Sequence, residues 1–591
     1  MKQRVADYIA DFLFKNGVTQ IFSVVGGMAM HLNNAFEMSP HLNVLYNHHE
    51  QACAIAAESY SRIENKMAAV CVTSGPGGTN ALTGVLCAYQ DSLPMIVISG
   101  QVRSETMIES TGLQLRQFGE QEYSIISSVT PMTKYATTIT DARQIAYHIG
   151  KALHVAQTGR PGPCWVDIPL DIQGQIIETD DLNMYVPPEE VPIDDTLIEK
   201  IITELRIAKR PVIIAGSSIR TSGALVKFQE LIDTLQIPVV CPTSTVDLMP
   251  PNQKNYYGMF GVFGGRAGNF IVQNADLLVS LGARLSFKQI GFNYGNFAPN
   301  AKKIVVDIDS QELRKPTLKV DLQVCANVKD IILSLCTVKP ELEEKSDWLN
   351  YCDTIKGEFS NLKISHRDSI SAYRFAPEFF RKADNNTVVV VGNNCAAVSV
   401  LQCGIQKFGQ RIYGNVNCGT MGYDLPAAIG AVIASGNEVY CMTGEGSFQM
   451  NIQELQTIAH NNLPVKIVIF NNNSYQAIVN TQKNFFNGEF AGCNSDSGIS
   501  FPSFKKLAEA YDFPICTITK SGEINDAIDW LLSIQGRAML ELMQTEPDPI
   551  EPKLSSRQLA NGNMVSTPID DMFPFLSRDE YNKYTFKEPA T

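Results

Sequence analysis

The sequence predicts an α/β protein built from three doubly wound parallel-sheet domains. Short apolar runs alternate with stretches of helical period along most of the 591 residues, which is the pattern of parallel strands joined by crossover helices. Glycine-rich turns follow several of these runs, as at Gly26-Gly27 and at Gly444-Glu445-Gly446-Ser447. A chain of this length is too long for one ordinary domain. We therefore expect domains at residues 1–170, 191–340 and 371–550, with a C-terminal tail at 551–591.

Composition and charge exclude several classes of protein. Hydrophobic residues make up 45% and charged residues 18% of the chain, as in a well-buried globular protein. A formal net charge of −13 argues against a nucleic-acid partner. No apolar run reaches the length of a membrane span, and the amphipathic N-terminal segment does not have the pattern of a signal peptide. The 14 cysteines are scattered without metal-binding spacing, so we expect reduced thiols in a cytoplasmic protein.

The first domain carries a carboxylate at the start of a predicted helix. Strands are expected at 21–25, 42–46, 67–73 and 95–99, and a helix at 51–62. Glu50 stands between the second of these strands and the helix. A carboxylate in that position can do no more than face the helix dipole, and His48 and His49 can be ordinary surface residues. The residues alone leave the structural and the functional reading of Glu50 open.

The middle of the chain reads as a second α/β unit behind a linker. Its strands are expected at 210–216, 237–240, 275–282 and 303–309, and the proline-rich segment 187–190 has linker composition. Residues 341–370 are polar with a helical pattern, so we expect a solvated connector there. The tail 551–591 is polar with little periodicity and is expected either to lie over the site or to be mobile.

The third domain contains the most informative stretch. Strands are expected at 387–391, 439–443 and 465–470, with a glycine turn after the second and a helix before the third. Polar loops at the carboxyl ends of neighbouring parallel strands lie together, so Glu445 and Asn472 can converge. Their hard oxygen atoms suit Mg²⁺, which takes its remaining ligands from phosphate and water. A plain Rossmann-like crossover with a chance Glu and Asn is the alternative.

Gly444–Ser474 resembles the GDG…NN signature of thiamine diphosphate (ThDP) enzymes, with Glu445 where aspartate is usual. In the first domain the segments HEQ, AAESYSR, TSGPGGTN and DSLPMIVISGQV resemble acetolactate synthase, in order and at matching spacing. The chain is therefore identified as a member of the acetolactate synthase-like family of ThDP enzymes, on the side of the large, catalytic subunit. The resemblance implies a pyrimidine-binding first domain, a Rossmann-like middle domain and a diphosphate-binding third domain.

The same resemblance implies the residues of the site. Glu50 would bind N1′ of the ThDP pyrimidine and, with Gln121, act in catalysis. Mg²⁺ would be held by the side chains of Glu445 and Asn472 and by the carbonyl of Ser474. The other cofactor-binding residues implied are Val25, Gly26, Gly27, Pro76, Asn80, Gly392, Asn393, Asn394, Gly419, Met421, Gly444, Gly446, Ser447, Tyr475, Gln476, Ala477 and Ile478. Met421 matches the residue that props the bent cofactor, although it can also be ordinary core.

Two features depart from the synthase pattern. The middle domain binds FAD in acetolactate synthase and ADP in some relatives, but Phe287-Lys288 replaces its acidic–arginine pair, so FAD, ADP and no ligand all stay open. The segment between Gln101 and Gln121 is longer than in the synthase, and Glu120 stands where a phenylalanine is usual. Thr481-Gln482, Phe485-Phe486 and Ser497-Gly498 also resemble synthase-like proteins of branched-chain sugar biosynthesis.

The resemblance implies a homodimer or homotetramer with the site between chains. The reaction it implies is ThDP- and Mg²⁺-dependent decarboxylation of a 2-keto acid, pyruvate first, with transfer of the two-carbon unit to a carbonyl acceptor. Glu120 favours a polar acceptor such as a keto-sugar, unless that carboxylate pairs with Arg116. The alternatives are an ordinary acetolactate synthase, a simple 2-keto acid decarboxylase, a ThDP oxidase that uses FAD, and a non-catalytic nucleotide-binding protein.

Overall fold

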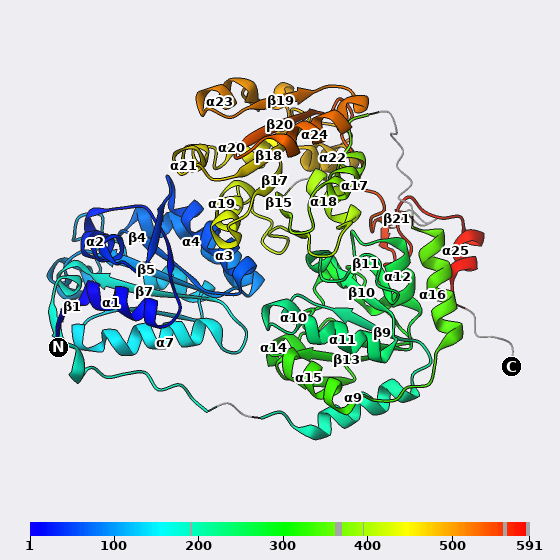
Figure 1. Cartoon of the computed structure of the whole chain (residues 1–591), viewed down its shortest axis with the longest axis horizontal. Coiled ribbons are helices and arrows are strands. Elements are labelled where there is room, and N and C mark those ends of the chain that lie inside the picture. The colour runs from blue at the N-terminus through cyan, green and yellow to red at the C-terminus, as the bar shows by residue number, and fades with distance from the viewer. Residues whose placement is uncertain (190–191, 361–368, 394, 559–563, 587–591) are drawn as a thin grey trace.

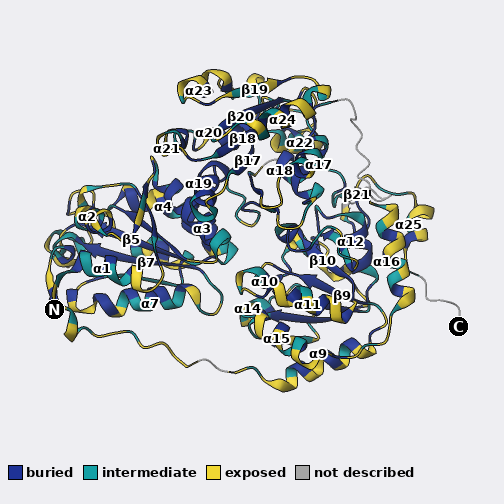
Figure 2. Ribbon diagram, in the orientation of Figure 1, coloured by how far each residue is buried: buried dark blue, intermediate teal, exposed yellow. Residues whose placement is uncertain are grey.

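The computed structural model describes residues 1–189, 192–360, 369–393, 395–558 and 564–586. In this part of the chain, three six-stranded parallel sheets form the centres of three domains (Figure 1). Figure 2 shows that the strands of the sheets are buried, while the outer helices are exposed on one side. The fold class expected from the sequence is confirmed.

The first sheet has the strand order β3-β2-β4-β5-β7-β6. Its strands are β2 (Gln20–Ser23), β3 (Asn43–Tyr46), β4 (Ala68–Val72), β5 (Met95–Gln101), β6 (Tyr135–Thr138) and β7 (Pro163–Pro169). Alternate residues of β4 enter different cores: Val70 packs into one and Ala69 into the other, so both faces of the sheet are covered. The covering helices include α1 (Val5–Lys15), α2 (Met30–Met38), α3 (Glu50–Glu64), α4 (Pro76–Asp91) and α7 (Ile145–Gln157).

The third sheet repeats the connectivity of the first. Its strands are β15 (Val388–Val391), β16 (Arg411–Tyr413), β17 (Val439–Gly444), β18 (Val465–Asn471), β19 (Ile515–Ile518) and β20 (Ala538–Met543). Their order β16-β15-β17-β18-β20-β19 matches the first sheet strand for strand. The connections leave β15 and β17 in opposite directions, and ligands of open α/β sheets bind at such switch points.

The middle sheet has a different order, β11-β10-β9-β12-β13-β14. Its strands are β9 (Pro211–Ala215), β10 (Val239–Pro242), β11 (Tyr256–Phe260), β12 (Leu277–Leu281), β13 (Lys302–Asp307) and β14 (Leu322–Cys325). When the six strands are numbered in the order in which they occur along the chain, this is the order 3-2-1-4-5-6 of the dinucleotide-binding Rossmann fold. The predicted Rossmann-like character of this domain is therefore confirmed at the level of topology.

The first and third domains share one hydrophobic core. Helix α3 lies along α19 (Asp424–Ser435), and alanines of both helices belong to the same buried cluster. The helices approach closely because Gly430 faces the backbone: a Cβ there would lie 2.1 Å from the carbonyl oxygen of Ala56. The hydroxyl of Ser59 donates to the carbonyl of Ala427 at 2.6 Å. Small residues on both helices thus hold the two domains together.

The expected solvated connector and the tail, which was expected to lie over the site or to be mobile, both pack against the middle domain. Helix α16 (Ser346–Glu358) buries Trp348 and Cys352, so the prediction of a solvated connector is wrong over this helix. The tail forms β21 (Ser556–Gln558), β22 (Met564–Ser566) and α25 (Arg578–Tyr584) and lies beside α16 at the edge of the molecule (Figure 1). Tyr351 of α16 donates to the carbonyl of Tyr584 at 2.7 Å. In its described part the tail is therefore docked on the middle domain.

The glycine turn after β17 also differs from the prediction. Gly444 ends the strand, and Glu445–Gln449 form a short helix, α20, followed by α21 (Glu454–His460).

Searching the described residues, we find no helix long and apolar enough to cross a membrane.

Candidate active site

A cavity of ≈ 180 Å³ lies at the carboxyl ends of β17 and β18. It collects most of the predicted residues of the third domain: Asn393, Met421, Gly444, Glu445, Gly446, Ser447, Asn472, Ser474, Tyr475, Gln476, Ala477 and Ile478. Gly392 lies beside it in a neighbouring cavity, and the carbonyl of Gly419 accepts a hydrogen bond from the Asn393 side chain. Asn394 lies outside the described residues. The sequence did not predict three lining residues from the segment after β20, which are Gln544, Pro547 and Asp548.

Glu445 joins the two strand ends at this cavity. Its Oε1 accepts the backbone N–H groups of Asn472 at 3.0 Å and of Ser474 at 2.9 Å. Burial raises the pKa of Glu445 to about 7, although these N–H groups counteract the rise. Oδ1 of Asn472 accepts the hydroxyl of Ser474 at 2.6 Å. The carboxylate of Glu445 and the amide oxygen of Asn472 thus lie at the same loop, and both are oxygen donors of the kind that Mg²⁺ takes.

Glycine at position 446 allows close packing at the floor of the cavity. A Cβ there would lie 2.2 Å from the Tyr475 ring and 3.2 Å from Cε of Met421, so any other residue would displace these side chains. Gly422, with φ +82°, donates its N–H to the hydroxyl of Ser447 at 2.9 Å. The turn that carries Met421 is thereby fixed to the helix that begins at Glu445. Free backbone groups beside small residues are the features that bind a diphosphate.

Asp424 holds the side chain of Ser447 in place through a hydrogen bond. It is fully buried at the start of α19 and accepts the Ser447 hydroxyl at 3.0 Å. Burial raises the pKa of its carboxyl group. No role for Asp424 was predicted from the sequence. The signal was a carboxylate directly before the apolar run Leu425-Pro426-Ala427, where a buried charge needs a reason.

Glu50 has a separate environment in the first domain. It begins α3, is 9% exposed, and accepts a hydrogen bond from the Asn80 side chain at 3.0 Å. Pro76 opens the neighbouring helix α4, and the position of a Cβ on Gly77 lies 3.5 Å from Oε1 of Glu50. The carboxylate, the amide and the start of α4 therefore lie together.

The other predicted residues of the first domain follow β2 or belong to a long loop. Val25 is 61% exposed and precedes Gly26-Gly27. Gln121 is exposed and adopts φ +58°, in the loop that carries Glu120. Glu122 organises this loop by accepting the N–H groups of Phe118 at 3.0 Å and Gly119 at 2.9 Å.

The two groups of residues do not line one common cavity within the single chain. The residues that line the cavity at Glu445 come from the third domain, and none of the described residues of the first domain is among them. The nearest link is made by the neighbours of Glu50: Gln51 accepts a hydrogen bond from Asn451 at 3.1 Å, and His48 donates its N–H to Glu454 at 3.0 Å.

The crevice of the middle domain contains a cavity of ≈ 80 Å³, and a second cavity of ≈ 100 Å³ lies between this domain and the third. Lys288 donates across the second cavity to the carbonyl of Val416 in the third domain. FAD, ADP and no ligand all stay predictions for this domain.

Comparison with known proteins agrees with the three-domain fold. The model described as "Thiamine pyrophosphate enzyme, N-terminal TPP binding domain" matches residues 3–118, the central-domain model matches 198–335, and the C-terminal TPP binding domain model matches 389–542. Among similar proteins, acetolactate synthase isozyme 1 large subunit of Escherichia coli (strain K12) is 28% identical over 95% of this chain and 97% of its own length. The acetolactate synthase large subunit of Lactococcus lactis subsp. lactis (strain IL1403) is 30% identical over 84% of each chain.

These matches and the glycine-lined cavity define the class: the protein is a ThDP-dependent enzyme, and the predicted resemblance is confirmed. More specifically, the chain belongs to the family of acetolactate synthase large subunits.

Proposed function

We propose that this enzyme decarboxylates a 2-keto acid, pyruvate first, and joins the two-carbon unit to a carbonyl acceptor. The observation that carries the proposal is the loop in which Glu445 binds the backbone of Asn472 and Ser474 at the cavity. In this proposal Glu445, Asn472 and the Ser474 carbonyl hold Mg²⁺, and the groups around Gly446 and Ser447 hold the diphosphate. Bound ThDP supplies the electron sink for decarboxylation.

The protein's own residues orient the cofactor and handle protons. Glu50 holds a proton on the cofactor's N1′, because a buried carboxylate stabilises a positive charge beside it. Asn80 fixes the orientation of Glu50 through its hydrogen bond. Met421 supports the bent cofactor from the turn fixed by Ser447, and Gln121 acts beside the reacting carbon from the long loop.

The site is proposed to form between two chains of a homodimer or homotetramer. What supports this is that none of the described residues of the first domain, Glu50 included, lines the Glu445 cavity of the single chain. In a C2 dimer, the first domain of each protomer would lie over the third domain of its partner, so that the dimer contains two equivalent sites. All 14 cysteines are free, which agrees with a reducing, cytoplasmic compartment.

The acceptor is proposed to be polar and larger than pyruvate, such as a keto-sugar. Glu120 is exposed in the loop of Gln121, and among the described ion pairs none joins it to Arg116. A free carboxylate there repels an anionic second keto acid and accepts hydrogen bonds from hydroxyl groups. The second candidate is an ordinary acetolactate synthase, which the relatives favour about equally.

Competition between acceptors tests the proposal. Pyruvate is supplied as donor with ThDP and Mg²⁺, and pyruvate and a keto-sugar nucleotide are offered together as acceptors. We expect the ligation product of the sugar to dominate. Efficient formation of acetolactate with the sugar ignored in excess would favour the ordinary synthase. Release of acetaldehyde alone would favour a simple decarboxylase.

FAD has no role in the proposed reaction, because decarboxylation with carboligation is redox-neutral. The oxidase alternative needs a tightly bound flavin, so purified protein with flavin absorbance in stoichiometric amount would revive it.

A further inference from the structure

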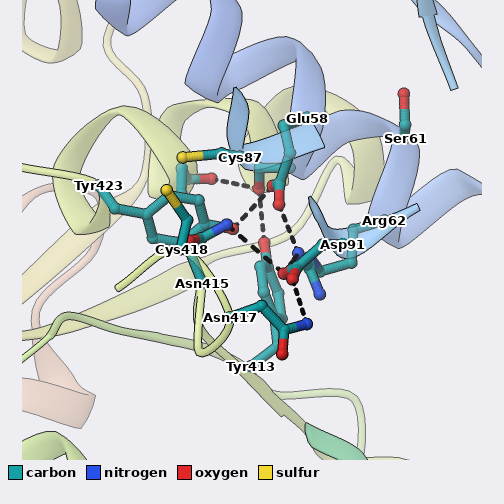
Figure 3. Close-up of polar contacts among 12 residues, drawn as sticks. Glu58, Ser61, Arg62, Cys87, Asp91, Tyr413, Asn415, Asn417, Cys418 and Tyr423 are labelled. Atoms are coloured by element: carbon teal, nitrogen blue, oxygen red, sulfur yellow. Dashed lines mark hydrogen bonds and ion pairs between the residues drawn. The ribbon is translucent and has the colours of Figure 1, made fainter. Parts of the chain in front are cut away.

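Two cysteines from different domains lie close together beside the proposed cofactor cradle, which is the Glu445 cavity with the loop of Gly419 and Met421. Cys87 lies on α4 of the first domain and Cys418 in the loop after β16 of the third. Their sulfur atoms contact the same hydroxyl, that of Thr420, at 3.2 Å and 3.1 Å. Figure 3 shows the two thiols side by side at the edge of a polar cluster. Both are free thiols, and neither is part of a disulfide.

The polar cluster holds the loop of Cys418 against α4. Asp91 lies one helical turn after Cys87 and accepts the side-chain N–H groups of Asn417 at 2.6 Å and Asn415 at 3.4 Å. Arg62 forms an ion pair with the same carboxylate. Contacts with one helix therefore fix the loop immediately before Cys418, so the two sulfur atoms stay adjacent.

The two thiols differ in accessibility and in acidity. Cys87 is fully buried, whereas Cys418 is partly exposed. The hydrogen bond from the Cys87 thiol lowers the pKa of Cys418, and Thr420 adds to this effect, while the carboxylates of Asp91 and Glu58 oppose it. The pKa of Cys87 is raised. Oxidants react with the accessible thiolate first, which here is Cys418.

We propose that Cys418 and Cys87 form an oxidation site that closes to a disulfide between the first and third domains. With hydrogen peroxide as oxidant, the Cys418 thiolate attacks one peroxide oxygen, and the hydroxide that leaves takes a proton to form water. The Cys87 sulfur then attacks the sulfur of the resulting sulfenic acid, and the hydroxyl group leaves as a second water with the Cys87 proton. Two thiols are oxidised and one peroxide is reduced; a dithiol reductant reverses the step by exchange.

The disulfide would act on the cofactor cradle. Gly419 and Met421 follow Cys418 directly, and the carbonyl of Gly419 accepts the Asn393 side chain at the cavity. A disulfide bond of about 2.05 Å is much shorter than the contact of about 3.5–4 Å between non-bonded atoms, so closing it pulls this loop toward α4. This consequence rests on the proposed cofactor site, whereas formation of the disulfide does not.

Mass spectrometry of the full chain tests the disulfide. Reduced protein is exposed to hydrogen peroxide, free thiols are blocked with N-ethylmaleimide, and the peptides are mapped. We expect Cys87 and Cys418 to be linked in the wild type and in Cys325→Ser, which removes an exposed thiol of the middle domain. Cys418→Ser and Cys87→Ala should each lose the link. Alkylation of both thiols after oxidation, or a link from Cys418 to another cysteine, would overturn the proposal.

ThDP affinity before and after oxidation tests the consequence. We expect the apparent Kd of the wild type to rise by roughly 10-fold, the effect of losing about one hydrogen bond to the cofactor. Dithiothreitol should restore the affinity, and Cys418→Ser should not respond. A linked protein with unchanged affinity would remove the coupling to the cradle. Reduced protein that binds no ThDP would instead contradict the proposed function and leave the disulfide result standing.

Discussion

Oε1 of Glu445 lies 3.0 Å from the backbone nitrogen of Asn472 and accepts its N–H. This bond joins the ends of the two central strands β17 and β18 at the Glu445 cavity. A cation bound there would replace part of this hydrogen bonding, so the metal and the diphosphate it carries are expected to bind as one unit.

ThDP and Mg²⁺ together should stabilise the protein against heat. Ligands that bind only the folded state add about 2.7 kcal/mol at 100 times Kd. Thermal melts with ThDP alone, Mg²⁺ alone and both would show the largest rise in Tm with both. Glu445→Ala should lose the joint effect, because the proposed metal site loses its carboxylate. Equal melting curves of the wild type at saturating ThDP and Mg²⁺ would contradict the cofactor site.

Glu50→Gln should remove most of the activity and leave the fold intact. Glutamine can still accept from Asn80, but it cannot stabilise a proton on the cofactor's N1′. Loss of such a group costs about 10² to 10⁴ in rate, measured as CO₂ release from pyruvate. Glu64→Gln, at the far end of the same helix, is the matched control and should retain normal turnover. Near-normal turnover of Glu50→Gln would remove Glu50 from the reaction.

Glu120→Phe should shift the enzyme from a polar acceptor toward pyruvate. A hydrogen bond to a charged group contributes about 1.5–3 kcal/mol, so transfer to the keto-sugar should fall roughly 10-fold to 100-fold relative to acetolactate formation. Glu105→Gln, in the same loop, is the control. If both variants keep the product ratio of the wild type, Glu120 does not contact the acceptor.

The docked tail should make stability depend on pH. Asp570 is 3% exposed and accepts the hydroxyl of Tyr581 at 2.8 Å. Burial raises the pKa of Asp570 from 3.8 to about 6. Between these values the folded chain binds more protons than the unfolded chain, so the free energy of unfolding falls as pH rises through this range.

Asp570→Asn removes this titration. The free energy of unfolding of Asp570→Asn relative to the wild type should therefore rise by about 1–3 kcal/mol as pH rises from about 4 to about 7. The measurement is the difference in Tm between the two proteins across this pH range. Asp579→Asn, exposed on the same tail segment, serves as the control. A constant difference in Tm across this range would mean that Asp570 does not titrate as described.

Local patterns predicted much of the fold and half of the candidate site. The apolar runs located most strands to within a few residues, because parallel strands buried on both faces read as continuous apolar segments. The approach of Glu445 to Asn472 followed from the shared edge at which parallel strands end. The same rule could not distinguish a glycine turn from the first turn of α20, since Gly444 suits both.

Contacts between distant segments could not be predicted from one sequence. The burial of α16 depends on Trp348, whose indole N–H donates to the carbonyl of Pro211 at 3.1 Å. The docking of the tail depends on Asn269, which donates to the carbonyl of Ile569 at 2.7 Å. The role of Asp424 depends on a serine in the next strand–helix unit. In each case the partner lies elsewhere in the sequence, so the hydrophobic periodicity of the segment itself does not reveal the contact.

The central claim is that Glu50 of one chain completes the Glu445 cavity of another. It is tested most directly by co-expressing Glu50→Gln and Glu445→Ala chains with different tags and purifying the mixed dimer. Each variant alone should be inactive, while the mixed dimer contains one site with both carboxylates intact. The account predicts that it recovers about half of the wild-type CO₂ release per dimer, since one of its two sites is complete. A mixed dimer as inactive as either parent would contradict a site shared between chains.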